Sequence, residues 1–320
     1  MLQAAFLSKM SGAPDCRISI VAVSDLQADW TVESRIRRVH GGACGKRGKS
    51  DRCRRRNIFR RSQATTGVVV LGGSSGRVDV GRARLFTDAG TSALALQWFG
   101  GEGQIPGICE IPLETFFAAT DYLIETGCRR IVYVGTSKGA EASLLAAVHD
   151  QRINAVVAIS PSSVVWGNIG AGRDGASWPE RSSWSLNGIA LPFVPADPDW
   201  TREYVDGLVS YRGLFECCLK TFKSEANAAT IPVETISAEL LLVAGGNDAL
   251  WPSLSFARDI IRRRGEAGKV THLISSPDAG HRILLPGEST PRSTLHAHGG
   301  NDEADSKLGR KAWEGIRGLL

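Results

Sequence analysis

The sequence predicts an α/β fold in which a mostly parallel sheet is covered by helices on both faces. From Gly67 onward, short apolar runs alternate with amphipathic segments, the pattern of strands and helices that follow one another in such a sheet. The first run, Val68 to Leu71, is apolar throughout, as a strand buried on both faces requires. The segment Gly135 to Gly139 adds a third indication, because it lies between an apolar run and a segment rich in small residues.

The individual elements are predicted from the period of their apolar residues. Leu113, Phe116 and Leu123 recur at near-helical spacing, and Gly127 is placed to end that helix. Right-handed crossovers are expected between the parallel strands. The expected strands are 17–23, 68–71, 93–99, 131–134, 155–160, 240–244 and 270–274. The expected helices are 81–89, 111–126, 138–149, 254–264 and 302–320.

The chain divides into a basic, poorly ordered N-terminal segment (1–66) and a folded domain (67–320). Between residues 35 and 61 lie twelve Lys or Arg residues and one acid, so that stretch carries +11 and the remainder −6. Within the folded domain, residues 161–237 interrupt the alternation and are rich in Trp, Pro, Gly and Ser. An insertion of this length after a strand is typical of a lid or a binding wall.

Composition limits the class of protein. The chain has 320 residues, of which 42% are hydrophobic and 22% charged, ordinary values for a globular protein. It has no apolar run of 18 residues and no secretory signal pattern, so no membrane span is expected. Seven cysteines without framework or zinc spacing favour a reducing, cytoplasmic location and no bound metal. The basic stretch lacks interleaved aromatic residues, so no nucleic acid partner is expected, and no motif calls for a cofactor.

Ser137 is the candidate nucleophile. It is the central residue of a G-x-S-x-G segment that follows a predicted strand and precedes a predicted helix. In that context the serine lies on a sharp turn, where neighbours two residues away must be small, and Gly135 and Gly139 meet that condition. The helix that follows directs free backbone N–H groups toward an anion beside the hydroxyl.

A serine hydroxyl needs a base, and the base needs an acid that orients it. His281 follows the last predicted strand in a glycine-containing loop and is the candidate base. Asp248 follows the preceding strand and is the candidate acid, with Asp278 as its rival. His296 and His298 lie further along the chain in a Gly-, Ser- and Pro-rich stretch and are not expected in the site.

Backbone N–H groups are expected to bind the oxyanion that forms during attack on a carbonyl group. Gly73 and Ser74 follow the first core strand, where glycine lets the backbone approach a ligand closely. Lys138, directly after Ser137, supplies the other N–H group from its backbone.

From Gly67 to Leu320, about four fifths of its length, the chain resembles the catalytic domain of the acyl-CoA thioesterase and bile acid-CoA:amino acid N-acyltransferase family. The segments that carry the resemblance are 69–74, 98–101, 110–114, 135–141, 160–161, 246–253, 280–281 and 299–301. The resemblance implies an α/β-hydrolase fold with Ser137, Asp248 and His281 as nucleophile, acid and base. It also implies a small-molecule substrate, an acyl ester or an acyl-CoA. The transferases of this family carry cysteine where this chain has Ser137, so the serine favours hydrolysis.

The main hypothesis is therefore a serine hydrolase that cleaves acyl-CoA thioesters through an acyl-enzyme. Family members usually carry a β-sandwich domain ahead of the catalytic domain, whereas the 66 residues that precede it here are basic and unlike a sandwich. A carboxylic ester hydrolase similar to the dienelactone hydrolases is consequently the alternative. An acyl-CoA N-acyltransferase and a non-catalytic binding protein are further alternatives, ranked below these two.

Overall fold

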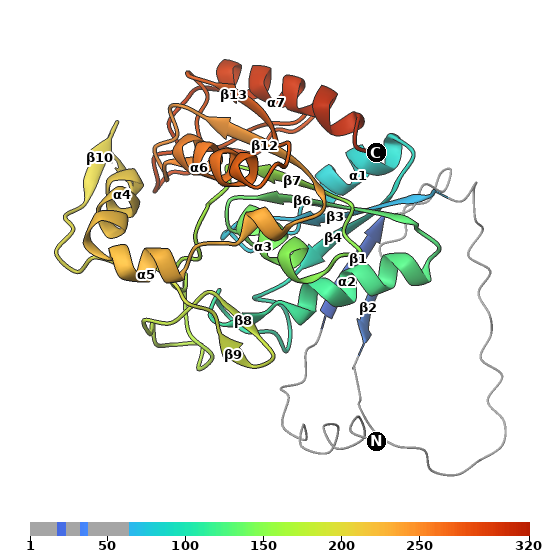
Figure 1. The fold of residues 1–320 in the computed structure, drawn as a ribbon, viewed down its shortest axis with the longest axis horizontal. Coiled ribbons are helices and arrows are strands. Elements are labelled where there is room, and N and C mark those ends of the chain that lie inside the picture. The colour runs from blue at the N-terminus through green and yellow to red at the C-terminus, as the bar shows by residue number, and fades with distance from the viewer. Residues whose placement is uncertain (1–17, 24–32, 38–63) are drawn as a thin grey trace, which may run out of the picture.

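The centre of the fold is an eight-stranded sheet with the order β13-β12-β7-β6-β3-β4-β1-β2 (Figure 1). The computed structural model describes residues 18–23, 33–37 and 64–320. The strands of this sheet are β1 Ile18–Val23, β2 Glu33–Arg37, β3 Thr66–Leu71, β4 Ser92–Gln97, β6 Arg130–Thr136, β7 Ala155–Ile159, β12 Glu239–Gly245 and β13 His272–Ser276. The six strands from β13 to β4 are parallel, and β1 is antiparallel to both β4 and β2.

Helices cover both faces of the sheet. They are α1 Val80–Asp88, α2 Glu114–Glu125, α3 Lys138–His149, α6 Ser253–Glu266 and α7 Asp302–Arg317. Alternate residues of β3 reach opposite cores, because successive side chains of a strand point to opposite faces. Val69 and Leu71 belong to the core that α2, α3 and α6 share, while Val68 and Val70 belong to the core that α1 and α7 share. Strand β3 is thus buried on both faces, which explains its apolar run.

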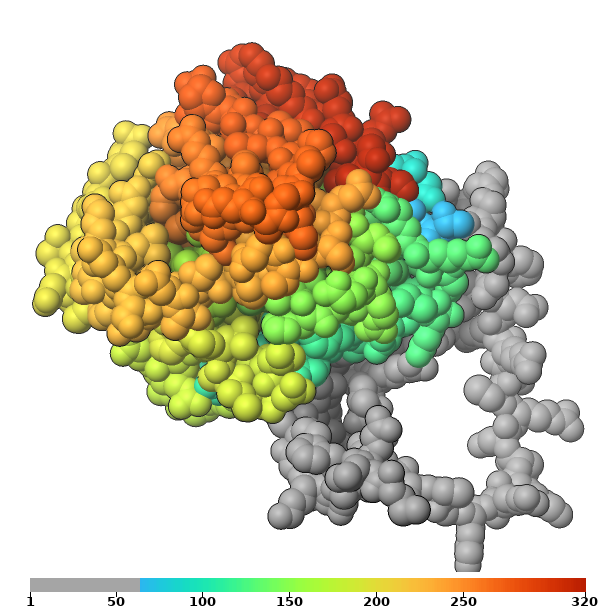
Figure 2. Space-filling view, in the orientation of Figure 1, coloured from blue at the N-terminus to red at the C-terminus, as the bar shows by residue number. Residues whose placement is uncertain are grey.

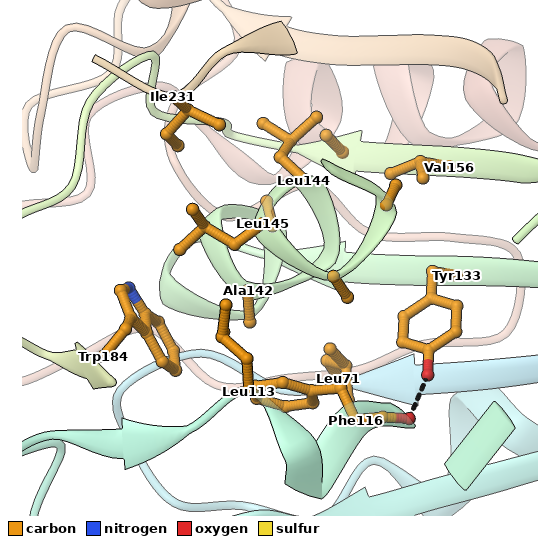
Figure 3. Packing of buried hydrophobic residues seen from close by; sticks show 14 of the residues in the cluster. Leu71, Leu113, Phe116, Tyr133, Ala142, Leu144, Leu145, Val156, Trp184 and Ile231 are labelled. Carbon is orange, nitrogen blue, oxygen red and sulfur yellow. Dashed lines mark hydrogen bonds between the residues drawn. The ribbon is translucent and has the colours of Figure 1, made fainter. Parts of the chain in front are cut away.

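Figure 3 shows the core between the sheet and helices α2 and α3. Leu71, Phe116 and Tyr133 meet there, and the hydroxyl of Tyr133 donates a hydrogen bond of 2.6 Å to the carbonyl oxygen of Phe116. Ala142 on α3 is small enough to let this helix pack closely against its surroundings, and Leu145 lies one turn further along the same helix. This packing fixes α3, whose first turn adjoins the candidate site.

The insertion lies between β7 and β12. It contains β8 Trp184–Leu186, β9 Ile189–Ala190, β10 Glu203–Val205, β11 Leu208–Ser210, α4 Arg212–Thr221, α5 Lys223–Ala228 and the 3₁₀ turn η1 Val233–Thr235. In Figure 2 it forms the yellow-green and yellow side of the molecule, next to α6 in orange. Its strand β8 pairs with β5 (Ile111–Pro112), so the insertion also contacts the chain ahead of α2.

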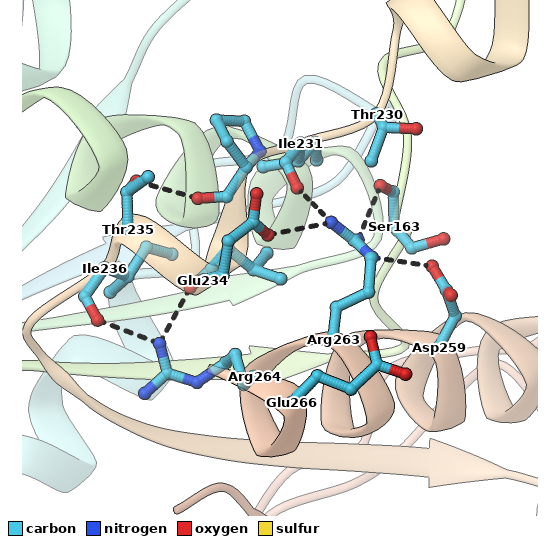
Figure 4. Close-up of polar contacts among 12 residues, drawn as sticks. Ser163, Thr230, Ile231, Glu234, Thr235, Ile236, Asp259, Arg263, Arg264 and Glu266 are labelled. Carbon is cyan, nitrogen blue, oxygen red and sulfur yellow. Dashed lines mark hydrogen bonds and ion pairs between the residues drawn. The ribbon is translucent and has the colours of Figure 1, made fainter. Parts of the chain in front are cut away.

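Two arginines of α6 hold both ends of the insertion (Figure 4). Arg263 donates to the carbonyl oxygen of Ile231 at 2.7 Å and to that of Ser163 at 3.3 Å. Arg264 donates to the carbonyl oxygens of Val233 and Ile236 at 2.8 and 2.9 Å. Through these four hydrogen bonds to backbone carbonyl oxygens, the two arginines anchor the insertion to the sheet domain.

Glu110 makes a further attachment. Its carboxylate accepts a hydrogen bond of 2.7 Å from Arg181 and lies 3.4 Å from Arg173, and both arginines belong to the insertion. Its backbone N–H donates to the carbonyl oxygen of Ser182 at 2.8 Å. The segment 110–114, singled out in the sequence, therefore joins the insertion to the domain.

Most expected elements are present, with shifted ends. The helix expected from residue 111 begins at Glu114, because Ile111 and Pro112 pair as a strand. The last strand begins two residues later than expected, at His272, and the last helix ends at Arg317. These differences lie at element ends, where the apolar period gives the least information.

The N-terminal segment differs more from expectation. Strand β1 matches the strand expected at 17–23, and β2 had no counterpart in the prediction. Both strands belong to the segment 1–66 and extend the sheet at β4, so the division at residue 66 does not coincide with the edge of the sheet. Of the basic stretch 35–61, residues 38–61 lie outside the described residues.

Candidate active site

Ser137 lies at the turn between β6 and α3 in a strained backbone conformation. Its φ of 57° and ψ of −120° are uncommon for a residue with a side chain. A Cβ atom on Gly135 would overlap the carbonyl oxygen of Gly139, and one on Gly139 would lie 2.5 Å from the carbonyl oxygen of Leu71. Only glycine therefore fits on either side of the turn, which holds Ser137 at the carboxyl end of β6.

His281 and Asp248 are in direct contact. His281 Nδ1 lies 2.8 Å from Asp248 Oδ2, and both side chains are buried. The other oxygen of Asp248 accepts the backbone N–H groups of Leu250 and Trp251 at 2.9 and 3.2 Å, which fixes the orientation of the carboxylate. Asp278, the rival in the sequence, is exposed.

The second ring nitrogen of His281 is free. Nε2 is buried and has no hydrogen-bond partner among the described residues, so it makes no bond with Ser137 Oγ in this structure. Ser137 and His281 nevertheless line the same pocket. Such bonds between base and nucleophile are often long in the unliganded state and tighten when substrate binds. With Nδ1 held by Asp248, Nε2 is the nitrogen available for proton transfer.

A segment that the sequence placed outside the site lies between the loop of Asp248 and the loop of His281. The carbonyl oxygen of His298 accepts the N–H of His281 at 2.8 Å, and Gly299 forms a β-bridge with Asp248. Gly299 has φ of 64°, and a Cβ atom there would overlap the carbonyl oxygen of Asn247. Glycine at this position lets the two loops come together.

The rings of His296 and His298 also line the pocket, contrary to expectation. The centres of the His298 and His281 rings are 5.9 Å apart. Burial, followed by the nearby charge that His281 would carry, lowers the pKa of His298 to about 4. His298 is consequently neutral at pH 7 and adds no second cation beside the base. In the sequence, only Gly299 and Gly300 indicated that the backbone of this segment comes close to another one.

The three candidate oxyanion residues lie at the pocket beside Ser137. A Cβ atom on Gly73 would be 3.3 Å from Ser137 Cβ, so the Gly73 backbone lies directly against the serine. The N–H of Lys138 belongs to the first turn of α3, where N–H groups have no acceptor within the helix. Ser74 is exposed on the same loop as Gly73.

The pocket has a volume of about 810 Å³ and two different sides. The insertion and the loop after β12 supply an apolar side made of Trp166, Ile169, Val194, Tyr211, Leu214, Phe215, Cys218, Leu250 and Trp251. Trp166 and Phe215 pack edge to face there, with ring centres 4.6 Å apart. The other side comes from α1 and the loops after β3 and β13, and it contributes polar residues beside a few apolar ones: Arg77, Arg82, Arg282 and Thr290 with Ile283 and Leu284. Ser137 and His281 line the same pocket as these two sets of residues.

A largely buried ion pair connects the segments around the site. Arg82 on α1 donates two hydrogen bonds to Glu288, at 2.6 and 2.8 Å, and a third to Thr136 Oγ1 at 2.6 Å. Thr136 directly precedes Ser137, and Glu288 lies on the loop after His281. Burial alone would raise the pKa of Glu288, but the charge and hydrogen bonds of Arg82, with help from Leu285 N–H and Arg77, hold it below its ordinary value.

Glu288→Gln is expected to lower the free energy of unfolding at pH 7 by about 3 kcal/mol, because it leaves Arg82 buried without its counter-charge. The folded-state pKa of Glu288 is lowered, so its contribution is complete above the unfolded-state value and is lost as the pH falls through the folded-state value. Urea unfolding at pH 7 and below about pH 4 measures this. The exposed Glu303→Gln is the control. A difference between wild type and Glu288→Gln that is the same at both pH values would contradict the prediction.

Within the described ranges, no group of three or more His, Cys, Asp or Glu side chains could hold a metal ion. The four described cysteines, Cys109, Cys128, Cys217 and Cys218, are free. Among the helices that the structure describes, none is both long and apolar enough to cross a membrane.

The parallel sheet, the helices on both faces and the strand-turn-helix that carries Ser137 define an α/β-hydrolase fold. The profile of the family described as "BAAT / Acyl-CoA thioester hydrolase C terminal" matches residues 111–319, and the chain belongs to this family.

Two relatives identified by sequence agree with this placement. Human acyl-coenzyme A thioesterase 1 is 25% identical over 262 residues, which are 78% of this chain and 58% of the relative. Mouse acyl-coenzyme A amino acid N-acyltransferase 1 is 26% identical over 226 residues, 69% of this chain and 49% of the relative. The chain spans about half the length of these relatives. Among solved structures, a monoacylglycerol lipase of Paleococcus ferrophilus has a TM-score of 0.44 at 19% identity, covering 79% of this chain and 95% of the lipase.

Proposed function

We propose that this protein is a serine hydrolase that cleaves acyl thioesters, with acyl-CoA as the preferred class of substrate. The observation that carries the proposal is the contact of 2.8 Å between His281 Nδ1 and Asp248, which leaves Nε2 free in the pocket that Ser137 also lines. The family of the chain and the names of its thioesterase relatives support the choice of a thioester.

In the proposed reaction, Ser137 Oγ attacks the thioester carbonyl carbon while His281 Nε2 takes the hydroxyl proton. The N–H groups of Gly73 and Lys138 bind the oxyanion, with Ser74 on the same loop as Gly73. The C–S bond then breaks, and the proton passes from His281 to the leaving thiolate. Water attacks the acyl-enzyme with His281 again as base, which releases the carboxylic acid and free Ser137.

The apolar side of the pocket is proposed to bind the acyl group. Trp166, Phe215 and Trp251 provide large apolar surfaces near Ser137, and an acyl chain gains free energy when it leaves water for such a surface. The insertion supplies most of this side, so we infer that the insertion determines which acyl chains are accepted.

A carboxylic ester hydrolase remains the second candidate, and one observation favours it. Within the described residues, each cationic side chain that lines the pocket already has an acidic partner: Arg77 with Asp79, Arg82 with Glu288, Lys138 with Glu141, and Arg282 with Asp302. The phosphates of CoA would have to compete with these partners. N-Acyl transfer, named for some relatives, is a third possibility, in which an amine would replace water as the acceptor.

Parallel assays of acyl-CoA thioesters and p-nitrophenyl esters with the same acyl chains test the choice of substrate. The thioesterase proposal predicts a kcat/KM for the thioester at least about tenfold above that for the ester, equivalent to ~1.4 kcal/mol in the transition state. The reverse ratio would support the ester hydrolase. Mass spectrometry of the products with glycine or taurine present identifies an N-acyltransferase by its amide product.

A further inference from the structure

The first turn of α3 contains an ion pair that is shielded from water. Lys138 Nζ lies 2.7 Å from Glu141 Oε2, and the side chains are 1% and 0% exposed. Lys138 Nζ also lies 5.1 Å from the centre of the Trp184 ring. Two charges buried in this way are weak evidence for stability by themselves, because their desolvation is costly. A role for this ion pair must therefore come from the other hydrogen bonds that Glu141 makes.

The second oxygen of Glu141 binds the insertion. Glu141 Oε1 accepts the indole N–H of Trp184 at 2.7 Å and the backbone N–H of Trp166 at 3.1 Å. One carboxylate thus joins the helix that begins after Ser137 to two tryptophans that belong to the insertion. Figure 3 shows Trp184 facing α3, with Ala142 and Leu145 on the helix.

Both ends of this connection reach the pocket. The backbone N–H of Lys138 is the proposed oxyanion donor, and the ring of Trp166 forms part of the apolar side where the acyl group is proposed to bind. The indole N–H of Trp166 donates to Ser162 at 2.8 Å, so its ring is held as well. A shift of Trp166 would therefore act on Glu141 and, through the ion pair, on Lys138.

We propose that Glu141 is a positioning residue that couples the acyl-binding wall of the insertion to the oxyanion donor at Lys138. This inference rests on the proposed serine hydrolase activity. An acyl group that packs against Trp166 stabilises the arrangement of Trp166, Glu141 and Lys138. The length of the acyl chain should then affect kcat as well as KM, because the binding energy of the remote acyl chain helps to align the reacting carbonyl group.

Trp184→Phe tests the coupling, because it removes the indole N–H that Glu141 accepts while keeping an aromatic ring. Trp98→Phe is the matched control. Trp98 is also buried and packs on Trp184 with ring centres 5.3 Å apart. It is not among the hydrogen-bond partners of Glu141 within the described residues. The measurements are kcat and KM for p-nitrophenyl acetate and p-nitrophenyl octanoate, and for the matching CoA thioesters, together with thermal unfolding of each variant.

Trp184→Phe is expected to lower kcat for the octanoyl substrate about tenfold, with KM changed less than threefold and a smaller loss for the acetyl substrate. Trp98→Phe is expected to lower thermal stability to a similar extent while keeping kcat. Glu141→Gln should lower kcat further, by about a hundredfold. If Glu141→Gln does not fold, the comparison of Trp184→Phe with Trp98→Phe still tests the coupling.

Equal kcat values for the two tryptophan variants, or a loss in Trp184→Phe that is the same for acetyl and octanoyl substrates, would overturn the coupling. Failure of the proposed activity itself has a different signature. In that case the wild-type protein hydrolyses none of the four substrates, so the comparison between variants has no baseline.

Discussion

Ser137→Ala is expected to reduce turnover by about 10⁴-fold or more, as the loss of the nucleophile does in other serine triads. Folding should be unaffected, because the hydroxyl has no side-chain partner among the described residues that would be left unpaired. The alanine keeps the small volume that the turn requires. The measurement is kcat/KM on the best thioester or ester substrate, together with thermal unfolding of both proteins.

Ser255→Ala, on the exposed surface of α6, is the control for this substitution and should keep wild-type activity. If Ser137→Ala retained more than about a tenth of the wild-type rate, a loss below ~1.4 kcal/mol, then Ser137 would not be the nucleophile.

Asp248→Asn is the second substitution with a large expected effect, a fall in kcat of about 10⁴-fold. In the proposed mechanism the carboxylate accepts the N–H of His281 Nδ1, so the proton stays on that nitrogen and Nε2 acts as the base. An amide group at this position can donate instead, which favours the tautomer with its proton on Nε2. It also removes the charge that stabilises the imidazolium during proton transfer.

Asp278→Asn provides the control, because this residue was the rival acid in the sequence and is exposed. It should keep wild-type kcat over the whole pH range. A large loss of kcat in Asp278→Asn with little loss in Asp248→Asn would show that Asp278, and not Asp248, orients His281.

Much of the fold could be predicted from the sequence, because each core element has a simple apolar pattern. Strand β3 contains the apolar run Val68 to Leu71 and is buried at every position. Helix α3 was expected at 138–149 and has those bounds, since the elbow motif fixes its start and its small residues pack on the sheet. Strand β2 could not be predicted in this way, because Glu33–Arg37 has no apolar alternation and joins the sheet by pairing with β1.

The candidate site was partly predictable for a similar reason. Ser137, Asp248 and His281 each follow a core strand, and the carboxyl ends of parallel strands meet at one edge of a sheet. His298 reaches the site through backbone contacts of its own segment. No short sequence motif predicts such contacts. The ion pair of Arg82 with Glu288 joins residues 206 positions apart, a separation that residue spacing cannot reveal.

The attachment of the insertion to α3 could not be predicted from the sequence either. In the sequence, Lys138 was a candidate only through its backbone N–H, Glu141 was only part of segment 135–141, and the tryptophans were only a feature of the insertion's composition. Their connection depends on the three-dimensional path of the insertion, which brings Trp166 and Trp184 to one carboxylate. Irregular segments of this kind have no period from which such a path can be predicted.

The most direct test of the central claim is to react the wild-type protein with a fluorophosphonate and to locate the adduct by peptide mass spectrometry. Such reagents phosphonylate a serine that is activated by a neighbouring base. The account predicts one adduct, on Ser137, with loss of hydrolysis in proportion to labelling, and no adduct in Ser137→Ala. Labelling on another residue, or full hydrolysis by a protein labelled at Ser137, would contradict it.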